Sequence, residues 1–140
     1  MMEYKFYNAK NANIVDERGL TPRDYYDLLS NIWSKKTCAP RMQDRWTKEN
    51  QTLGQCSITA FLMQDIYGGL VYGVPLEDGN FHCFNVIGDT VFDLTSEQFG
   101  DVVLDYDNVI LQSRDVHFKK EEKKNRYLVL KDELFKALNK

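Results

Sequence analysis

The feature that most constrains the fold is a segment, running from about Gly54 to Tyr67, that is apolar on nearly every side. A surface helix has a polar stripe, whereas a helix that is apolar all round is buried. Gly68-Gly69 follows at once and supplies the stop, because glycine readily adopts the left-handed conformation that ends helices. The sequence therefore predicts a central helix that the rest of the chain covers.

Three segments after this helix have the composition of β-strands, at residues 70–75, 81–87 and 90–94. A four-residue turn with Asp78-Gly79 separates the first two. Gly88-Asp89 fits a two-residue hairpin turn between the last two. These patterns predict that the buried helix packs on a small antiparallel sheet.

A second helix is expected over residues 22–34, where apolar residues recur at helical spacing. Its start is marked by Thr21 as a cap, Pro22 at the first helical position and Asp24 in the first turn. Residues 1–20 have weak periodicity and are expected to form an extended N-terminal arm.

The C-terminal part, from about residue 120 to 139, has the pattern of a further helix. Residues 35–52 are irregular and fit a long surface loop, and short extended segments are expected at 102–104 and 109–111. The length of 140 residues suits one domain, so we expect residues 1–140 to form a single α+β domain.

The composition excludes several function classes. The net charge of −3 and the pI of about 5.4 argue against a nucleic-acid binder, and the lysines at residues 119–124 are interrupted by Glu121-Glu122, as on a solvated helix face. No segment approaches the roughly 20 apolar residues of a membrane span, and the N-terminus lacks the apolar part of a signal peptide. Three unevenly spaced cysteines suit a reducing cytoplasm. We therefore expect a cytoplasmic protein with no nucleic-acid or membrane partner.

Cys56 lies near the predicted start of the buried helix. Unpaired main-chain N–H groups and the positive end of the helix dipole stabilise an anion there, which lowers the pKa of a thiol. The same N–H groups can bind an oxyanion. Cys56 is therefore a candidate nucleophile, and the structural alternative is a small core residue.

A nucleophilic cysteine needs a base and a group that orients the base, and the predicted hairpin offers both. If Gly88-Asp89 is the turn, Phe84 faces Asp93, and His82 shares a sheet face with Phe84. Asp93 then lies one diagonal step from His82, a distance at which its carboxylate can reach the imidazole ring. A register slip of one residue would separate them.

Polar residues upstream of Cys56 are candidates for contact with a substrate. Gly54 would let a substrate approach the main chain closely. Gln55, Asn50 and Gln51 can either donate to an oxyanion or cap the helix, and Trp46 lies in the same loop. We therefore predict that the substrate is bound by Gly54, Gln55, Asn50 and Trp46.

The other reactive side chains are expected to be structural. Cys83 should point away from the face of His82 and serve as a packing residue, Cys38 should lie in a loop, and His117 should be exposed. A zinc site is not favoured, because its candidate ligands form no CxxC or HxxxH pair. These ligands would be Cys56, His82, Cys83 and His117. No phosphate-binding or dinucleotide-binding motif is present, so we expect no metal and no cofactor.

The motifs that carry a resemblance to a known family are Leu20-Thr21-Pro22, Trp33, Trp46-Thr47-Lys48-Glu49-Asn50, Leu53-Gly54-Gln55-Cys56-Ser57-Ile58-Thr59-Ala60, Gln64-Asp65, Gly68-Gly69, His82, Asn85 and Asp93-Leu94-Thr95-Ser96-Glu97-Gln98-Phe99. With these motifs, most of the chain from residue 20 resembles the YunG-like family of uncharacterised bacterial proteins. The family brings no established activity.

More distantly, the order of Cys56, His82 and Asp93 is similar to that in papain-like and transglutaminase-like cysteine enzymes. That resemblance implies a papain-like core and acyl transfer, with the thiolate as nucleophile, His82 as base and acid, and Asp93 orienting the ring. The preferred hypothesis is a cysteine hydrolase or acyltransferase (peptidase, amidase or deamidase) acting on a peptide, a protein or a small amide. The alternative is a non-catalytic binding or regulatory module, in which exposed aromatics such as Trp46 would matter.

Overall fold

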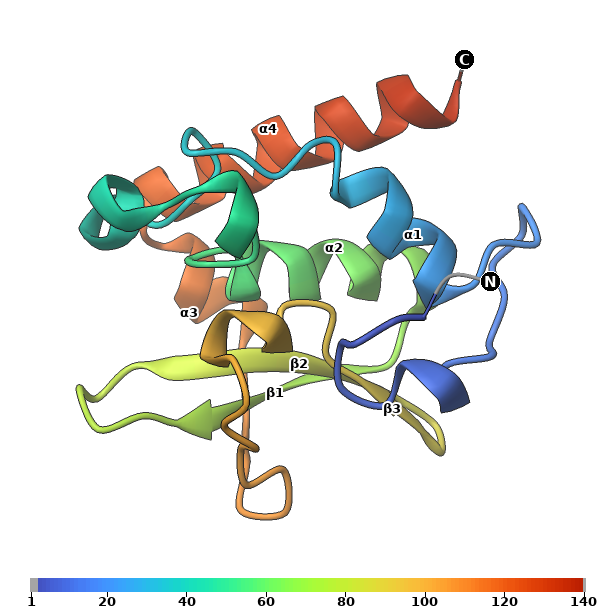
Figure 1. The fold of residues 1–140 in the computed structure, drawn as a ribbon, viewed down its shortest axis with the longest axis horizontal. Coiled ribbons are helices and arrows are strands. Elements are labelled where there is room, and N and C mark those ends of the chain that lie inside the picture. Colours follow the sequence, from blue (N-terminus) through green and yellow to red (C-terminus); the bar gives the residue numbers. More distant parts are fainter. Residues whose placement is uncertain (1–2, 140) are drawn as a thin grey trace.

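The computed structural model describes residues 3–139, and helix α2 (Cys56–Tyr67) lies at its centre. Figure 1 shows α2 between the C-terminal helix α4 (Glu121–Leu138) on one side and a small sheet on the other. Ile58, Phe61 and Leu62 of α2 are completely buried. The prediction of a buried central helix is confirmed from Ser57 to Met63, whereas Asp65 near its end is exposed.

The sheet contains β1 (Leu70–Pro75), β2 (Phe81–Ile87), β3 (Thr90–Phe92) and β4 (Ile110–Leu111). Their spatial order is β3-β2-β1-β4, and each neighbouring pair is antiparallel. Asn85 of β2 donates a hydrogen bond to the carbonyl of Ala60, which ties the sheet to α2. The α+β class and the small antiparallel sheet are therefore confirmed.

The register of the β2–β3 hairpin is the one predicted from the Gly88-Asp89 turn. Ile87 pairs with Thr90, and Asn85 pairs with Phe92. Strand β3 ends at Phe92, two residues earlier than expected. Asp93 instead forms an isolated bridge with Tyr7, whose carbonyl accepts from the Asp93 N–H at 3.3 Å.

Helix α1 (Pro22–Leu29) begins at the predicted capping box, in which Thr21 and Asp24 satisfy each other's main-chain N–H groups. It ends five residues before the predicted limit of 34. The Ser30 hydroxyl donates to the carbonyl of Tyr26, and such side-chain bonding to the preceding turn competes with helix continuation. The chain then turns inward.

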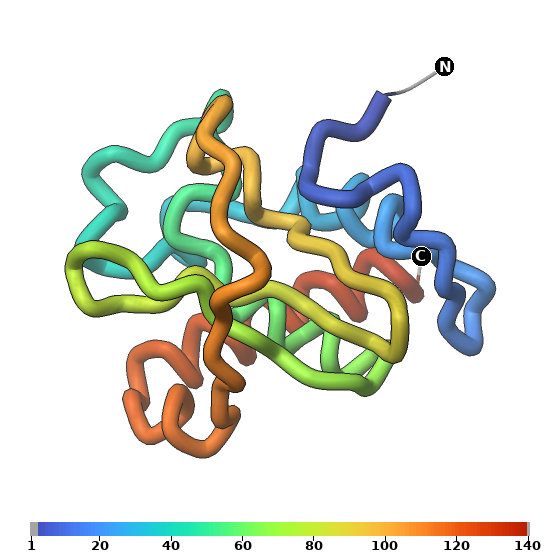
Figure 2. Tube along the Cα trace, turned by 90° about the horizontal axis from the view of Figure 1, so that it is seen from below, coloured from blue at the N-terminus to red at the C-terminus, as the bar shows by residue number. Residues whose placement is uncertain are grey.

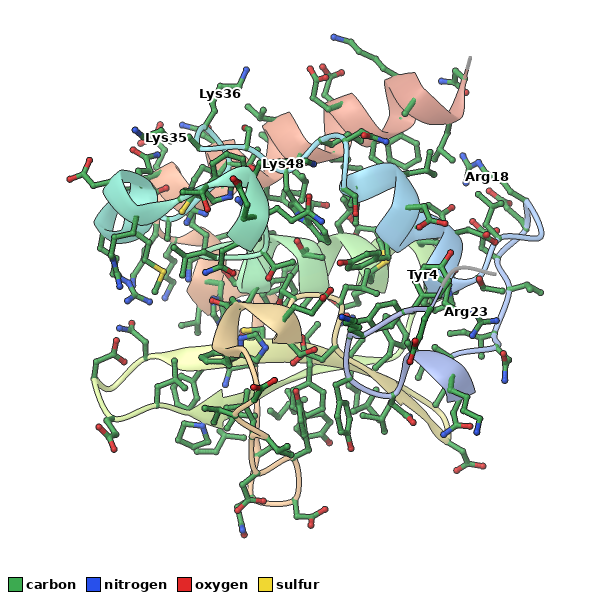
Figure 3. All side chains as sticks on the ribbon, in the orientation of Figure 1. Tyr4, Arg18, Arg23, Lys35, Lys36 and Lys48 are labelled. Atoms are coloured by element: carbon green, nitrogen blue, oxygen red, sulfur yellow. The ribbon has the colours of Figure 1, made fainter. Side chains whose placement is uncertain are left out.

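The N-terminal segment is part of the core rather than a free extended arm. It contains a 3-10 turn at Ala9–Asn11 and buries Phe6 and Ala9. Arg23 of α1 holds it in place by donating to the carbonyls of Ala9 at 2.7 Å and Ala12 at 3.1 Å (Figure 3).

The long loop before α2 is irregular, as predicted, apart from 3-10 turns at Pro40–Arg45 and Lys48–Asn50. A third 3-10 turn, Ser96–Phe99, follows the hairpin. The next segment crosses the sheet (orange in Figure 2) and leads to the short helix α3 (Arg114–Phe118), which was not predicted.

The expected extended segment at 102–104 has no regular structure, whereas the one at 109–111 contains β4. Within residues 3–139, no helix is both long enough and apolar enough to cross a bilayer.

Candidate active site

A cavity of about 550 Å³ opens between the start of α2, the β1–β2 hairpin and the helices α3 and α4. Cys56 and His82 both line it, together with Gly54, Ser57 and Phe81. The cavity therefore brings the predicted nucleophile and the predicted base to one surface.

Cys56 is the first residue of α2, where the main-chain N–H groups of the first turn have no partner within the helix. Its side chain is half-buried, whereas Cys38 and Cys83 are buried. Its sulfur lies 3.9 Å from the carbonyl oxygen of Phe81. Of the three thiols, Cys56 is therefore the one that a molecule in the cavity can reach.

His82 is 1% exposed, and its Nε2 atom lies 2.6 Å from Oδ2 of Asp93. Its Nδ1 atom is buried and has no hydrogen-bond partner within residues 3–139. The Cys56 thiol lies beside this ring, close enough for each group to shift the pKa of the other. The edge of the Phe99 ring closes the site, with its centroid 4.7 Å from that of the imidazole.

Asp93 is held by more than His82. Its Oδ2 atom also accepts from the Tyr106 hydroxyl at 2.7 Å, and its Oδ1 atom accepts from the main-chain N–H and the hydroxyl of Thr95 at 3.2 and 3.3 Å. Burial and the charge of Asp93 raise the pKa of Tyr106, so that its hydroxyl stays protonated and donates. A carboxylate with this many donors keeps its orientation.

The arrangement favours a thiolate beside an imidazolium. Contact with the Cys83 thiol lowers the pKa of Cys56, burial opposes this, and the adjacent ring and charge of His82 add to the lowering, which leaves the pKa well below its usual value. Burial by itself would lower the pKa of His82, but the charge and hydrogen bond of Asp93, helped by Cys56, raise it to about 10. Both shifts favour transfer of the thiol proton to the ring.

Cys83 has a larger part in this site than predicted. It is buried in the core, as expected of a packing residue, but its thiol also lies close enough to that of Cys56 to shift its pKa. Contact with Cys56, together with burial, raises the pKa of Cys83, so Cys83 stays a thiol and a donor. Because side chains alternate along β2, Cys83 and His82 point to opposite faces of the strand. The Cys83 side chain nevertheless reaches the start of α2, where Cys56 lies.

The predicted substrate-binding residues are only partly brought together. Gly54 lines the cavity, whereas Gln55, Asn50 and Trp46 do not. Gln55 is buried and donates to the carbonyl of Ser34 instead of capping α2. The Trp46 indole donates to the carbonyl of Gln51, so it stabilises its own loop.

His117 and Lys123 also line the cavity, so the expectation of an exposed histidine is wrong. The expected solvated lysine face is confirmed for Lys119, Lys120 and Lys124 but not for Lys123, which is half-buried. The Lys123 ammonium donates to Nδ1 of His117 at 2.9 Å, and Nε2 of His117 donates to Oε1 of Gln112 at 2.7 Å. Burial and the charge of Lys123 lower the pKa of His117 to about 4, so His117 is neutral. It accepts from Lys123 and is not a second base for Cys56.

Several parts of the site carried no clear signal in the sequence. Tyr106 and Phe99 reach the His82–Asp93 pair from segments without periodicity. The contact of Thr95 with Asp93 could have been predicted, because an aspartate side chain commonly accepts a hydrogen bond from the main chain two residues later. Within residues 3–139, no three histidine, cysteine or acidic side chains are arranged to hold a metal ion.

Comparison with known proteins places the chain in a family without assigning it an activity. It is 35% identical over 72 residues to a Bacillus subtilis (strain 168) protein described as "Uncharacterized protein YunG", a match that covers 51% of this chain and 57% of that protein. The match thus spans little more than half the length of that relative. No solved structure matches the chain, and the papain-like core stays a prediction. The family model described as "YunG protein" matches residues 21–139, and the chain belongs to that family.

Proposed function

We propose that this protein is a cysteine-dependent acyl-transfer enzyme, a hydrolase or acyltransferase with Cys56 as nucleophile, His82 as base and acid, and Asp93 as the orienting residue. The observation that carries the proposal is the state of His82. Its Nε2 atom is engaged by Asp93, while its buried Nδ1 atom, beside Cys56, has no hydrogen-bond partner in the described part of the chain. A buried polar atom without a partner is costly, and catalytic sites are where such atoms are retained.

In the first step, the Cys56 thiolate attacks the carbonyl carbon of an amide or ester, and its electron pair forms the new S–C bond. The imidazolium of His82 gives its Nδ1 proton to the leaving nitrogen or oxygen as the bond to the carbonyl carbon breaks. The product is a thioester on Cys56 and a neutral His82. Throughout this step Nε2–H stays hydrogen-bonded to Asp93, which fixes the orientation of the ring.

In the second step, the neutral His82 takes a proton from water, or from another acceptor nucleophile, through Nδ1. The resulting nucleophile attacks the thioester, and the S–C bond breaks to return the Cys56 thiolate. The unpaired N–H groups at the start of α2 supply the oxyanion site in both steps, because Gln55 does not cap them. A cysteine at the head of a helix and a histidine and aspartate on a following hairpin support the papain-like arrangement.

The experiment is acylation of the intact protein by p-nitrophenyl acetate, followed by intact-mass and peptide-mass spectrometry. We expect one acetyl group on Cys56, rapid release of nitrophenol, and slower loss of the acetyl group. His82→Ala should slow acylation by about a hundredfold or more, the scale of a lost general base. Acetylation spread over surface lysines, with Cys56 unmodified, would contradict the proposal.

Matched variants separate catalysis from simple thiol reactivity. Cys38→Ala removes a buried thiol outside the cavity and should leave the acylation rate unchanged. Asp93→Asn keeps the shape of the side chain but removes its charge, and it should slow both acylation and deacylation. If His82→Ala slows only the acylation of Cys56 and leaves the deacylation rate unchanged, His82 is not a catalytic base.

A further inference from the structure

We infer that the cavity beside Cys56 binds a carboxylate, so that the substrate of the proposed reaction is an amide or ester that itself carries a carboxylate group. The inference rests on the proposed function and adds a substrate class to it. The side chain assigned to that carboxylate is Lys123.

The first support is the separation of charge within the molecule. The chain as a whole carries a net charge of −3. The cavity, in contrast, is lined by four basic side chains and one acidic side chain. These are Arg41, Lys120, Lys123, Arg126 and Glu122. A cavity lined by one sign of charge concentrates ligands of the opposite sign.

Two of the four basic side chains are already neutralised. Arg126 is buried and binds the carboxylate of Glu122 on the same helix, and Arg41 lies 3.3 Å from the carboxylate of Asp78. Lys123 and Lys120 form no ion pair with a carboxylate among residues 3–139. Lys123 is half-buried whereas Lys120 is exposed, so Lys123 is the enclosed cation that has no carboxylate partner among these residues.

The second support is the way in which Lys123 is held. Its ammonium donates to the neutral His117, which is itself fixed by Gln112, and all three side chains line the cavity. Burial lowers the pKa of Lys123, and the charge of the Cys56 thiolate opposes this lowering. A positioned ammonium that retains free donors and lies within electrostatic reach of the nucleophile suits a carboxylate across the cavity from the reacting carbonyl.

The test compares iodoacetate with iodoacetamide, two alkylating reagents of similar size that differ by one negative charge. Both transfer their carbon to the Cys56 thiolate with loss of iodide, so the ratio of their rates cancels the fraction of thiolate. We expect Lys123→Met to lower the iodoacetate-to-iodoacetamide ratio by about three- to tenfold, the effect of one unit charge in a partly solvated site. Added salt should lower the wild-type ratio in the same direction.

Lys124→Met is the matched control, because Lys124 is the next residue of α4, is exposed and does not line the cavity. It should leave the ratio unchanged. An unchanged ratio in Lys123→Met would overturn the inference, while a fast, His82-dependent reaction with iodoacetamide would still support the proposed function. A slow reaction with iodoacetamide in the wild type would instead count against the proposed function alone.

A binding measurement that needs no reactive thiol completes the test. On the Cys56→Ser protein, N-acetylglycine should produce saturable NMR shifts, and N-acetylglycinamide, which lacks the charge, should bind at least about threefold more weakly. Lys123→Met should abolish that preference. Tighter binding of inorganic phosphate than of N-acetylglycine would contradict the assignment to a carboxylate, and absence of any charge preference would contradict the inference as a whole.

Discussion

Nε2 of His82 and Oδ2 of Asp93 lie 2.6 Å apart, and each side chain is 1% exposed. A pair this deeply buried resists solvent screening, so the aspartate charge acts on the ring at nearly full strength. The ring in turn faces the half-buried Cys56. The ionisation of His82 and of Cys56 is therefore linked to the stability of the fold.

In the wild type, the pH dependence of stability from this site should be small above neutrality. The folded state holds one proton on His82, whose pKa is raised from 6.5 to about 10, while Cys56 is ionised well below its ordinary pKa of 9.0. Between pH 6.5 and 9.0 the unfolded state also holds one proton, on the cysteine. Equal proton binding in the two states means no slope.

Cys56→Ser should expose the contribution of His82. Asp93 still raises the pKa of His82, so the folded state retains a proton that the unfolded state releases above pH 6.5. The extra stability is then complete below that pH and is lost as the pH rises through the folded pKa. Urea denaturation from pH 6 to 10 should show this decline, and adding Asp93→Asn should remove it. A flat profile for Cys56→Ser would contradict the shift.

Cys83→Ala should raise the pKa of Cys56, because the neighbouring Cys83 thiol is the largest cause of its lowering. Ultraviolet absorbance of the thiolate, followed against pH, measures this directly. Cys38→Ala removes another buried thiol and should leave the titration of Cys56 unchanged. Identical titrations in the two variants would show that Cys83 is only a packing residue.

Tyr106→Phe should destabilise the protein by about 1.5–3 kcal/mol, the scale of one hydrogen bond to a charged group. The lost bond is the 2.7 Å contact with Asp93, and the ring can still stack on Tyr7. Tyr7→Phe is the matched control, because no hydrogen bond is found for the Tyr7 hydroxyl among residues 3–139. Chemical denaturation should separate the two variants, and equal stabilities would contradict the prediction.

Gly54→Ala should cost more stability than Gly79→Ala. Both glycines have a positive φ, of 72° and 85°, so both substitutions strain the main chain. At Gly54 an added Cβ would lie 2.5 Å from the sulfur of Cys38 and 2.9 Å from the nitrogen of Ala39, whereas at Gly79 nothing lies within 4 Å. We expect about 1–3 kcal/mol for strain and a further loss at Gly54 alone. Equal melting temperatures would contradict the contact with Cys38.

The elements that follow from local patterns were predicted well. The buried helix, the first two strands and the hairpin register depend on the periodicity of apolar residues and on a two-residue turn, which are properties of neighbouring residues. That register placed His82 near Asp93, and the distance of 2.6 Å confirms it. Helix α1 was overextended, because Ser30 hydrogen-bonds to the preceding turn.

The sequence by itself determined which residues could serve as nucleophile, base and orienting group, because the order and spacing of Cys56, His82 and Asp93 are local to one helix and one hairpin. Only the tertiary structure decided how Asp93 is held by Tyr106, that Cys83 lies against Cys56, and that Lys123 faces the same cavity. These contacts join segments far apart in the chain. Their effect on pKa depends on burial and on distances through space, which no local pattern encodes.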